Sequence, residues 1–486
     1  MYVEVSIPIA LFKTFTYIVP ENFQKQIFLG QSVFIPFNKN IINGFIVKIE
    51  SKNQYKGKIL ELHSINNNSF TISNELWKTL SWISKYYLCP IGTVLNKTIS
   101  YQHKQTYRIP LIQYIKITQK GREALNSINY KTQKKFLTIL NDFSGSINIK
   151  KLQTVSSSYI QVCKKLEQSN YVSLKSSPNI KGILQSSIQS KKITLSTGQN
   201  NIYKNLINSL KKKSSKPILL SGISASGKTI VYIKIIESYL SNKKQIIVLV
   251  PEVSLIQKTF NELNTYFSNT VGVWHSKLSK SEKNYVLDGM KTRHLNIIVG
   301  TRSAIFMPFN RLGLIVVDEE QENSYKQDFN IPYYNAKDVA LMRSKFNQSS
   351  IILVSSTPSL ETYYNVKKKQ YQNHDLKETY FKNQLPEVKL VNMSLQKGIL
   401  SKILIDKIES ALKKKEQIVL LQNKKGFSRA GILKVENILY KFFPNIRILK
   451  YDQNIISKKD EYYNILNQFQ AYKADVLIGT QFLAKG

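Results

Sequence analysis

The segment from Gly222 to Thr229 carries the residue types that hold a polyphosphate. It fits the spacing G-x-x-x-x-G-K-[ST] of a phosphate-binding loop. Its two glycines let backbone N–H groups turn inward at a helix N-terminus, where the helix dipole favours negative charge. We predict that Lys228 contacts the outer phosphates and that the Thr229 hydroxyl binds Mg²⁺. The predicted nucleoside triphosphate site is made of Gly222, Ile223, Ser224, Ala225, Ser226, Gly227, Lys228 and Thr229.

The elements that must position this loop flank it in the sequence. Residues 217–220 predict a buried strand before the loop, and residues 230–239 predict a helix after it. The alternative is a glycine-rich turn before an ordinary helix, but the lysine and threonine at the last two positions favour phosphate binding. Upstream, Gln199 is a candidate reader of the adenine edge. A solvent-exposed glutamine with no ligand is the alternative for that residue.

Two carboxylates end a second apolar run, residues 314–317. In a nucleotide-hydrolysing α/β domain, the first such carboxylate holds Mg²⁺ and the next positions or deprotonates the attacking water. We therefore assign Asp318 to the metal and Glu319 to the water, which makes Lys228, Asp318 and Glu319 the predicted catalytic set. The alternative is a polar cap on a buried strand.

Two further strand ends carry hydroxyl groups. Thr301 and Arg302 follow one predicted strand and are candidates for the phosphates of a single nucleic-acid strand. Residues 355–358 follow the next strand, and their hydroxyls are candidates for linking the nucleotide state to domain movement. Either segment alone is also an ordinary strand terminator, so the order of the motifs carries the interpretation.

Aromatic residues gather directly after the carboxylates. Bases stack on such rings with about 1–3 kcal/mol each, largely regardless of base sequence. The alternative is a small aromatic cluster packed on the domain surface. The residues predicted to contact DNA here are Tyr325, Lys326, Phe329, Tyr333 and Tyr334.

The composition of the chain narrows its partners. The 486 residues include 70 Lys and Arg against 31 Asp and Glu, which leaves a net charge of +39. Such a charge attracts polyanions, although AT-rich codon usage also raises the lysine content. Cys89 and Cys163 are the only cysteines, which excludes a disulfide framework and a four-cysteine zinc site. No apolar run reaches the ~18 residues of a membrane span and no signal-peptide pattern opens the chain, so we expect a cytoplasmic protein without a membrane partner.

The pattern of apolar runs and helix-like stretches along the sequence predicts an α/β multidomain fold. Short β-like runs over residues 1–103 predict a small β domain, and the helix-rich residues 104–190 predict a winged-helix-like α+β domain. Residues 191–384 alternate buried strands with helices, which is typical of a parallel sheet, with strands expected at 245–250, 296–299, 313–317 and 350–354. Residues 385–486 repeat the pattern with three strands, at 417–421, 446–451 and 475–478, and we expect an incomplete second lobe. Polar stretches at 156–158 and 176–190 predict loops.

Taken in order, these motifs resemble superfamily 2 helicases and, more closely, the PriA family of primosomal replication restart proteins. The resemblance runs over nearly the whole chain, and its specific points include residues 15–20, 86–92, 249–252, 275–276, 300–340, 356–361, 385–388, 423–427 and 478–486. It implies two RecA-like lobes that use ATP and Mg²⁺ to unwind forked DNA from 3′ to 5′. It also implies an N-terminal 3′-end-binding domain, in which Phe15 and Tyr17 contribute to the pocket. The implied partners are forked and single-stranded DNA, primosome proteins and the machinery that loads the replicative helicase.

The chain also departs from the family pattern. Thr16 replaces the family's aspartate, which predicts a weaker bond to a 3′ hydroxyl, and Gln321 replaces a histidine. Residues 428–431 lead directly into a predicted helix at 435–443 where the family has a cysteine-rich module, so no zinc is expected. The later arginine-bearing motif is also absent, which predicts slow hydrolysis. The alternative function is therefore a fork-binding scaffold that binds ATP and DNA without unwinding.

Overall fold

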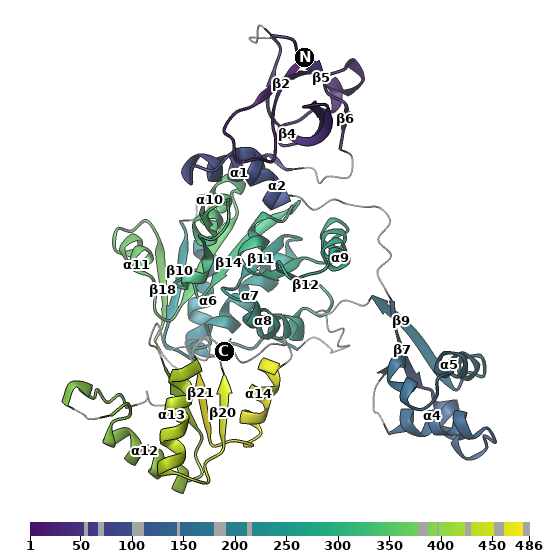
Figure 1. Cartoon of the computed structure of the whole chain (residues 1–486), viewed down its shortest axis with the longest axis vertical. Coiled ribbons are helices and arrows are strands. Elements are labelled where there is room, and N and C mark those ends of the chain that lie inside the picture. The colour runs from purple at the N-terminus through teal and green to yellow at the C-terminus, as the bar shows by residue number, and fades with distance from the viewer. Residues whose placement is uncertain are drawn as a thin grey trace. The chain divides into compact units, whose positions relative to one another are not determined.

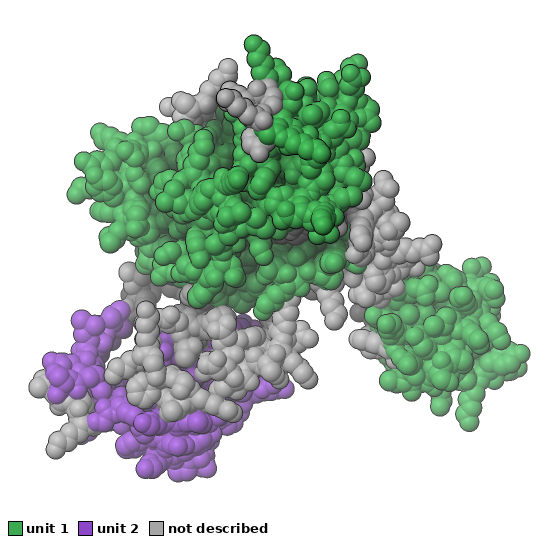
Figure 2. Space-filling view, turned by 45° about the horizontal axis from the view of Figure 1, so that its top comes forward, with its two compact units in different colours: residues 1–381 green, residues 382–486 purple. Residues whose placement is uncertain are grey.

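The computed structural model describes residues 1–52, 57–66, 72–99, 111–142, 146–178, 191–210, 216–377, 387–395, 398–422, 429–451 and 461–479. The chain separates into two compact units, residues 1–381 and 382–486 (Figures 1 and 2). The finer division of the first unit at residues 103 and 190 stays a prediction. None of the described helices is long and apolar enough to cross a membrane.

The N-terminal part of the first unit is a six-stranded sheet with the order β5-β2-β1-β4-β3-β6. These strands match the short β-like runs expected in this region. Alternate residues of β1 and β3, such as Val3, Val5, Val33 and Ile35, are buried in one core, as the two-residue period of a strand requires. The strands are β1 (Tyr2–Ser6), β2 (Phe15–Ile18), β3 (Ser32–Phe37), β4 (Asn40–Glu50), β5 (Leu60–Glu61) and β6 (Ser64–Ile65), with the 3-10 helix η1 (Glu21–Gln26) between β2 and β3.

Two helices, α1 (Asn74–Tyr86) and α2 (Ile91–Ile99), follow this sheet. The apolar residues of α1 recur at helical spacing, so Leu76, Leu80 and Ile83 form one buried face. That face joins the core of the seven-stranded sheet described below, whereas the β domain keeps a core of its own. The helix α1 lies against α10 (Ala336–Asn347) (Figure 1).

The next module combines an antiparallel sheet with helices. Its sheet has the order β8-β7-β9, and its core contains Phe136, Leu137, Leu140 and Cys163. The expected loop at 176–190 is wrong at its start, because Ser176 to Pro178 pair with β7 as the end of β9. The elements are β7 (Leu111–Ile117), α3 (Gln119–Glu123), η2 (Ala124–Asn126), α4 (Lys131–Asn141), β8 (Ile147–Asn148), η3 (Ile149–Thr154), α5 (Tyr159–Gln168) and β9 (Val172–Pro178).

The largest sheet of the first unit has seven strands in the order β12-β13-β11-β14-β17-β10-β18, and every pair is parallel. All of its predicted strands are confirmed. Successive residues of β14 alternate between two clusters of buried residues, one on each face, which explains why the strands read as continuous apolar runs. The strands are β10 (Ile218–Gly222), β11 (Gln245–Leu249), β12 (Val271–Trp274), β13 (Ile297–Gly300), β14 (Leu312–Asp318), β17 (Ser350–Ser355) and β18 (Gln372–Leu376).

Helices cover both faces of this sheet. One face packs against α6 (Thr197–Leu210), α7 (Lys228–Ser241) and α8 (Val253–Tyr266). The other packs against α9 (Lys280–Lys291), α10 and the apolar face of α1. The remaining elements of this region are η4 (Arg302–Phe306), η5 (Asn323–Tyr325), β15 (Lys326–Gln327), β16 (Tyr334–Asn335) and α11 (Leu360–Lys367).

The second unit contains a parallel sheet with the order β19-β21-β20, which confirms its three predicted strands. The predicted helix at 435–443 begins earlier, at Arg429. The motif segments at 423–427 and 480–486 lie outside the described residues, as do residues 385–386. The elements are η6 (Met393–Leu395), α12 (Lys402–Lys413), β19 (Ile418–Leu421), α13 (Arg429–Phe442), β20 (Ile448–Tyr451), α14 (Glu461–Gln470) and β21 (Val476–Gly479).

Candidate nucleotide and DNA sites

The glycine-rich loop lies between β10 and α7, where the sequence predicted it. The helix begins at Lys228, two residues earlier than expected. Gly227 has a left-handed backbone (φ 80°), and a Cβ atom there would lie 2.2 Å from Gln199 Nε2. A Cβ atom on Gly222 would lie 2.7 Å from the Leu376 carbonyl oxygen. Glycine is therefore favoured at Gly227 because the backbone is left-handed, and at Gly222 because a Cβ atom would collide with the Leu376 backbone.

The interior of the loop presents groups that suit a phosphate. Lys228 Nζ donates to the carbonyl oxygens of Gly222 at 2.8 Å and Ile223 at 3.1 Å. Loss of water lowers the pKa of Lys228, whereas the negative charges of Glu319 and Asp318 act to raise it. Ser226 Oγ is buried and has no hydrogen-bond partner among the described residues. An ammonium group and an unpaired hydroxyl at a helix N-terminus fit a polyphosphate.

Gln199 on α6 holds the loop through a hydrogen bond of its side chain. Its side chain is only 2% exposed, so the alternative of a solvent-exposed glutamine is wrong. Gln199 Nε2 donates to the Ser226 carbonyl oxygen at 3.1 Å, and Gln199 Oε1 accepts from Ser196 N at 3.0 Å. Gln199 N also donates to Ser196 Oγ, which completes a capping box at the start of α6. A contact of Gln199 with adenine stays a prediction.

The predicted carboxylates lie at the end of β14 and close to Lys228. Tyr232 Oη on α7 donates to Asp318 Oδ2 at 3.3 Å. Loss of water and the neighbouring Glu319 carboxylate raise the pKa of Asp318 to about 7. A divalent cation would relieve this unfavourable charge, so Asp318 and the half-buried Thr229 are suited to hold Mg²⁺.

Glu319 follows β14 with an unusual backbone conformation, and its side chain accepts a hydrogen bond. Its backbone is left-handed (φ 48°), an uncommon conformation for a residue other than glycine that is often found at functional sites. Gln321 Nε2 donates to Glu319 Oε2 at 2.7 Å, and Ser355 Oγ donates to Gln321 Oε1 at 2.6 Å. The carboxylate is therefore connected to the end of β17 through one amide side chain.

Glu320 is a site residue that the sequence did not reveal. Its carboxylate is fully buried and accepts from Lys337 Nζ at 2.9 Å, Ser359 N at 2.8 Å and Thr362 Oγ1 at 2.9 Å. These partners lie on α10, before α11 and on α11. The only signal in the sequence was a third acidic residue after the strand, and its partners lie too far along the chain to be inferred.

Two of the predicted DNA-contacting aromatic residues are buried. Tyr325 is 1% exposed, and its hydroxyl lies 2.5 Å from the Asp318 carbonyl oxygen and 3.0 Å from that of Leu249. Tyr334 is also buried, with its ring centroid 5.1 Å from that of Phe306. The prediction that these rings stack on bases is therefore wrong, because neither offers a free face to solvent.

The other members of this set remain candidates for DNA contacts. Phe329 is 87% exposed and Tyr333 is 43% exposed. Arg302 Nη1 donates to the Lys326 carbonyl oxygen at 2.5 Å. This bond brings the Thr301–Arg302 segment next to the aromatic segment, residues 325–334. Two segments that the sequence could only place separately therefore share one edge of the sheet.

The predicted 3′-end pocket lies on β2. Phe15 is half-buried, and its ring meets the edge of Phe37 with the centroids 5.0 Å apart. Lys13 Nζ lies 5.7 Å from the Phe15 ring centroid. Tyr17 is buried in the core of the β domain, and its hydroxyl donates to the Pro36 carbonyl oxygen at 3.0 Å. A direct DNA contact by Tyr17 is therefore wrong for this structure, whereas Phe15 and Thr16 stay candidates.

Comparisons with known proteins identify two regions of the chain. A family model of the PriA 3′ DNA-binding domain matches residues 4–100, and a model of DEAD/DEAH box helicases matches residues 197–366. The replication restart protein PriA of Chlamydia pneumoniae is 30% identical over 559 residues, which cover 100% of this chain and 74% of that protein. The chain belongs to the PriA family.

Further relatives carry the same name. The replication restart protein PriA of Chlamydia muridarum is 28% identical over 566 residues, covering 100% of this chain and 74% of that protein. The PriA of Rickettsia prowazekii is 41% identical over 220 residues, which cover 44% of this chain and 34% of its own. A solved structure of the DUF1998 helicase MrfA bound to DNA aligns with 59% of this chain and 40% of its own at 15% identity, with a TM-score of 0.41. Membership of the PriA family rests on the sequence matches.

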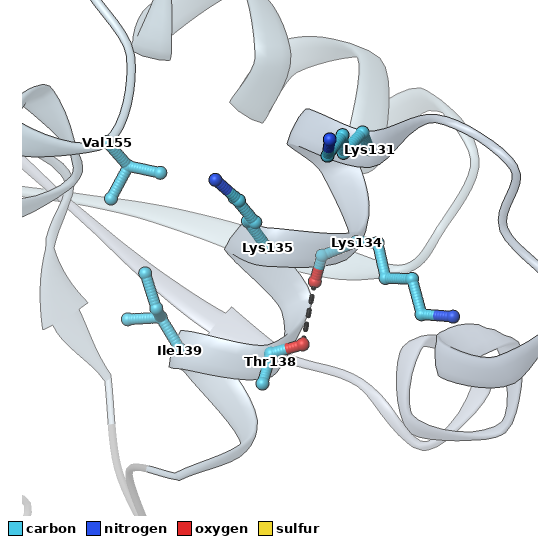
Figure 3. Close-up of a pocket in the computed structure, with 6 residues that line it drawn as sticks. All are labelled: Lys131, Lys134, Lys135, Thr138, Ile139 and Val155. Carbon is cyan, nitrogen blue, oxygen red and sulfur yellow. Dashed lines mark hydrogen bonds between the residues drawn. The ribbon is translucent and has the colours of Figure 1, made fainter.

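Neither family model covers the module between the two matched regions, which carries a basic groove. The groove has a volume of about 320 Å³. Ile139 and Val155 give it apolar walls, and Lys135 extends toward Val155 in Figure 3. None of the described residues that line it is acidic. The residues that line the groove are Lys131, Lys134, Lys135, Thr138, Ile139 and Val155.

Proposed function

We propose that this member of the PriA family is an ATP-dependent DNA helicase that unwinds forked DNA from 3′ to 5′ during replication restart. The observation that carries the proposal is the meeting of the glycine-rich loop with Asp318 and Glu319 at one edge of the helicase sheet. The match of residues 4–100 to a PriA 3′ DNA-binding domain supports DNA as the substrate. The name of the relatives supports a place in replication restart.

In this proposal the loop holds the triphosphate and the carboxylates act on its end. Lys228 exchanges its two carbonyl partners for phosphate oxygens, and Ser226 Oγ gains the partner that it lacks. Thr229 and Asp318 would hold Mg²⁺, and the bound ion would neutralise phosphate charge. Glu319 orients the attacking water and accepts its proton, while Gln321 keeps the carboxylate in place.

DNA would contact the lobe beside this site. Phe329 and Tyr333 offer exposed rings for stacking, and Thr301, Arg302 and Lys326 offer polar and cationic groups for phosphates. Tyr325 then connects the two sites, because its hydroxyl reaches the backbone of Asp318 while the segment that follows it carries the exposed rings. A strand held on those rings would bias the position of the catalytic carboxylates.

The basic groove on α4 would provide a second contact with DNA. Its lysines lie at positions i, i+3 and i+4 of one helix, so their ammonium groups share one side of the module. Phosphates complement this charge, and apolar walls accept a sugar or a base edge. Partners beyond DNA would be primosome proteins and the machinery that loads the replicative helicase, at replication forks in the cytoplasm.

Unwinding of labelled forks tests this function. Forks with either a 3′ or a 5′ single-stranded tail are incubated with the chain, ATP and Mg²⁺. The proposal predicts strand displacement from the 3′-tailed substrate and none by the Glu319→Gln variant, which retains the ATP-binding loop. Fork binding without displacement by the unaltered chain would overturn the helicase proposal in favour of a fork-binding scaffold.

A further inference from the structure

A tyrosine of the N-terminal region holds the start of α10 in the helicase lobe. Tyr87 Oη accepts from Asn335 N at 3.1 Å and donates to Asp338 Oδ2 at 3.1 Å. Tyr87 follows α1, whereas Asn335 and Asp338 lie 248 and 251 residues further along the chain. One hydroxyl group therefore joins two regions that match different family models.

Asn335 connects the end of the aromatic segment to α10. It ends β16 directly after Tyr333 and Tyr334, and it is also the N-cap of α10, because Asn335 Oδ1 accepts from Lys337 N at 2.9 Å. Its backbone N–H has Tyr87 as a partner. Removing the hydroxyl would leave this N–H and the Asp338 carboxylate without that partner, at the place where the segment is anchored.

The other end of α10 holds the segment that begins at Thr301 and Arg302. This segment and the aromatic segment are together called the DNA-facing segments, because the proposed function places DNA on both. The fully buried Arg343 donates to the carbonyl oxygens of Ile305 and, at 2.8 Å, of Met307. These carbonyls end the turn that begins at Thr301 and Arg302. Burial lowers the pKa of Arg343 to about 10, while the Glu75 carboxylate on α1 opposes this shift.

Helix α10 therefore contacts three parts of the molecule at once. Its start is fixed by Tyr87, its length packs against α1, and Arg343 fixes η4. The two DNA-facing segments also touch each other through Arg302 and the Lys326 carbonyl. The packing is continuous from α1 to both segments, so a restraint on α1 acts on the same helix that anchors them.

We propose that Tyr87 is a positioning residue through which the N-terminal DNA-binding domain orders the DNA-contacting edge of the helicase lobe. The proposal rests on the proposed function, in which Phe329, Tyr333 and Arg302 contact DNA. Binding of DNA to the N-terminal domain restrains α1, and the Tyr87 hydroxyl transmits this restraint to Asn335. Because coupling between two binding sites is reciprocal, DNA on the lobe also strengthens binding at the N-terminal domain.

The test replaces Tyr87 by phenylalanine in the full chain, which keeps the ring and removes the hydroxyl. The matched control is Tyr86→Phe, because Tyr86 is the largely exposed neighbour in the same aromatic group. The first readout is hydrogen exchange of the amides of residues 326–335 without DNA. We expect exchange in this segment to be on the order of tenfold faster in Tyr87→Phe and unchanged in Tyr86→Phe. Amides of β14 and β17 report whether the lobe remains folded.

The second readout is ATP hydrolysis stimulated by forked DNA relative to single-stranded DNA. We expect Tyr87→Phe to reduce the extra stimulation by the fork on the order of tenfold, with the DNA-free rate as reference. Asp338→Asn keeps a hydrogen-bond acceptor for Tyr87, so it should retain most of the stimulation. Unchanged exchange at residues 326–335, or unchanged fork stimulation, would overturn the proposal. If no DNA stimulates the unaltered chain, the proposed function fails, and the exchange result still decides whether Tyr87 positions the segment.

Discussion

Gln321 Nε2 lies 2.7 Å from Glu319 Oε2 and donates a hydrogen bond to it. The same side chain accepts from Ser355 Oγ on β17, so it both donates and accepts between two strand ends. An amide does this at any pH, whereas a histidine at this position would need the matching tautomer. Gln321 therefore forms a bridge to Glu319 that does not depend on protonation.

This bridge predicts a selective loss of turnover in Gln321→Ala. Glu319 would lose the group that fixes its carboxylate, so we expect the kcat for DNA-stimulated ATP hydrolysis to fall by about 10–100-fold with little change in KM for ATP. Steady-state kinetics measure both constants. Gln257→Ala, which removes a surface amide of α8, is the matched control. A kcat equal to that of the unaltered chain would contradict a positioning role for Gln321.

The Glu320–Lys337 ion pair predicts a stability defect. Lys337→Met removes the cation beside a fully buried carboxylate, so we expect the helicase lobe to lose about 3–5 kcal/mol of unfolding free energy. Lys413→Met removes a cation from an exposed helix pair with Glu409, and the expected change is within about 0.5 kcal/mol. Chemical denaturation followed by circular dichroism compares the two variants. Equal midpoints for both would show that Glu320 does not need Lys337.

The regular part of the fold could be predicted from the sequence because burial leaves a periodic signal. The apolar runs before Gly222 and Asp318 correctly predicted β10 and β14, and parallel packing then placed both strand ends at one edge. The exposure of the tyrosines could not be predicted in this way. Tyr325 and Tyr333 belong to the same polar segment, yet only Tyr333 is substantially exposed.

Roles that depend on distant partners were also beyond the sequence. Gln199 precedes Ser226 by 27 residues, and its bond to the Ser226 carbonyl exists only because α6 packs beside α7. Glu320 finds Ser359 and Thr362 at separations of 39 and 42 residues. Spacing within one segment gives no information about such pairs.

The exposed aromatic rings predict a loss of DNA affinity without a loss of stability. Phe329→Ala should weaken binding of single-stranded DNA by about 1–3 kcal/mol, because a largely exposed ring contributes little to the core. Tyr325→Phe should instead lower the melting temperature, since its hydroxyl bonds the backbone at the end of β14. Fluorescence anisotropy and thermal melting separate the two effects. Normal DNA affinity of Phe329→Ala would remove this residue from the proposed contact.

The groove on α4 predicts a change in the salt dependence of DNA binding. Replacing Lys131, Lys134 and Lys135 together by glutamine removes three phosphate contacts, so the slope of log K against log salt should fall by about 2–3 in magnitude. The same change at the surface residues Lys413, Lys414 and Lys415 keeps the total charge equal and serves as the control. Equal slopes for the two triple variants would contradict a specific role for the groove.

The central claim is that the Gly222–Thr229 loop drives a DNA-dependent ATPase, and phosphate release tests it most directly. The unaltered chain and Lys228→Ala are compared with and without forked DNA at saturating ATP and Mg²⁺. We predict that DNA raises the rate for the unaltered chain and that Lys228→Ala lowers the stimulated rate by about 10²–10³-fold. A rate that DNA does not change, or that Lys228→Ala retains, would contradict the account.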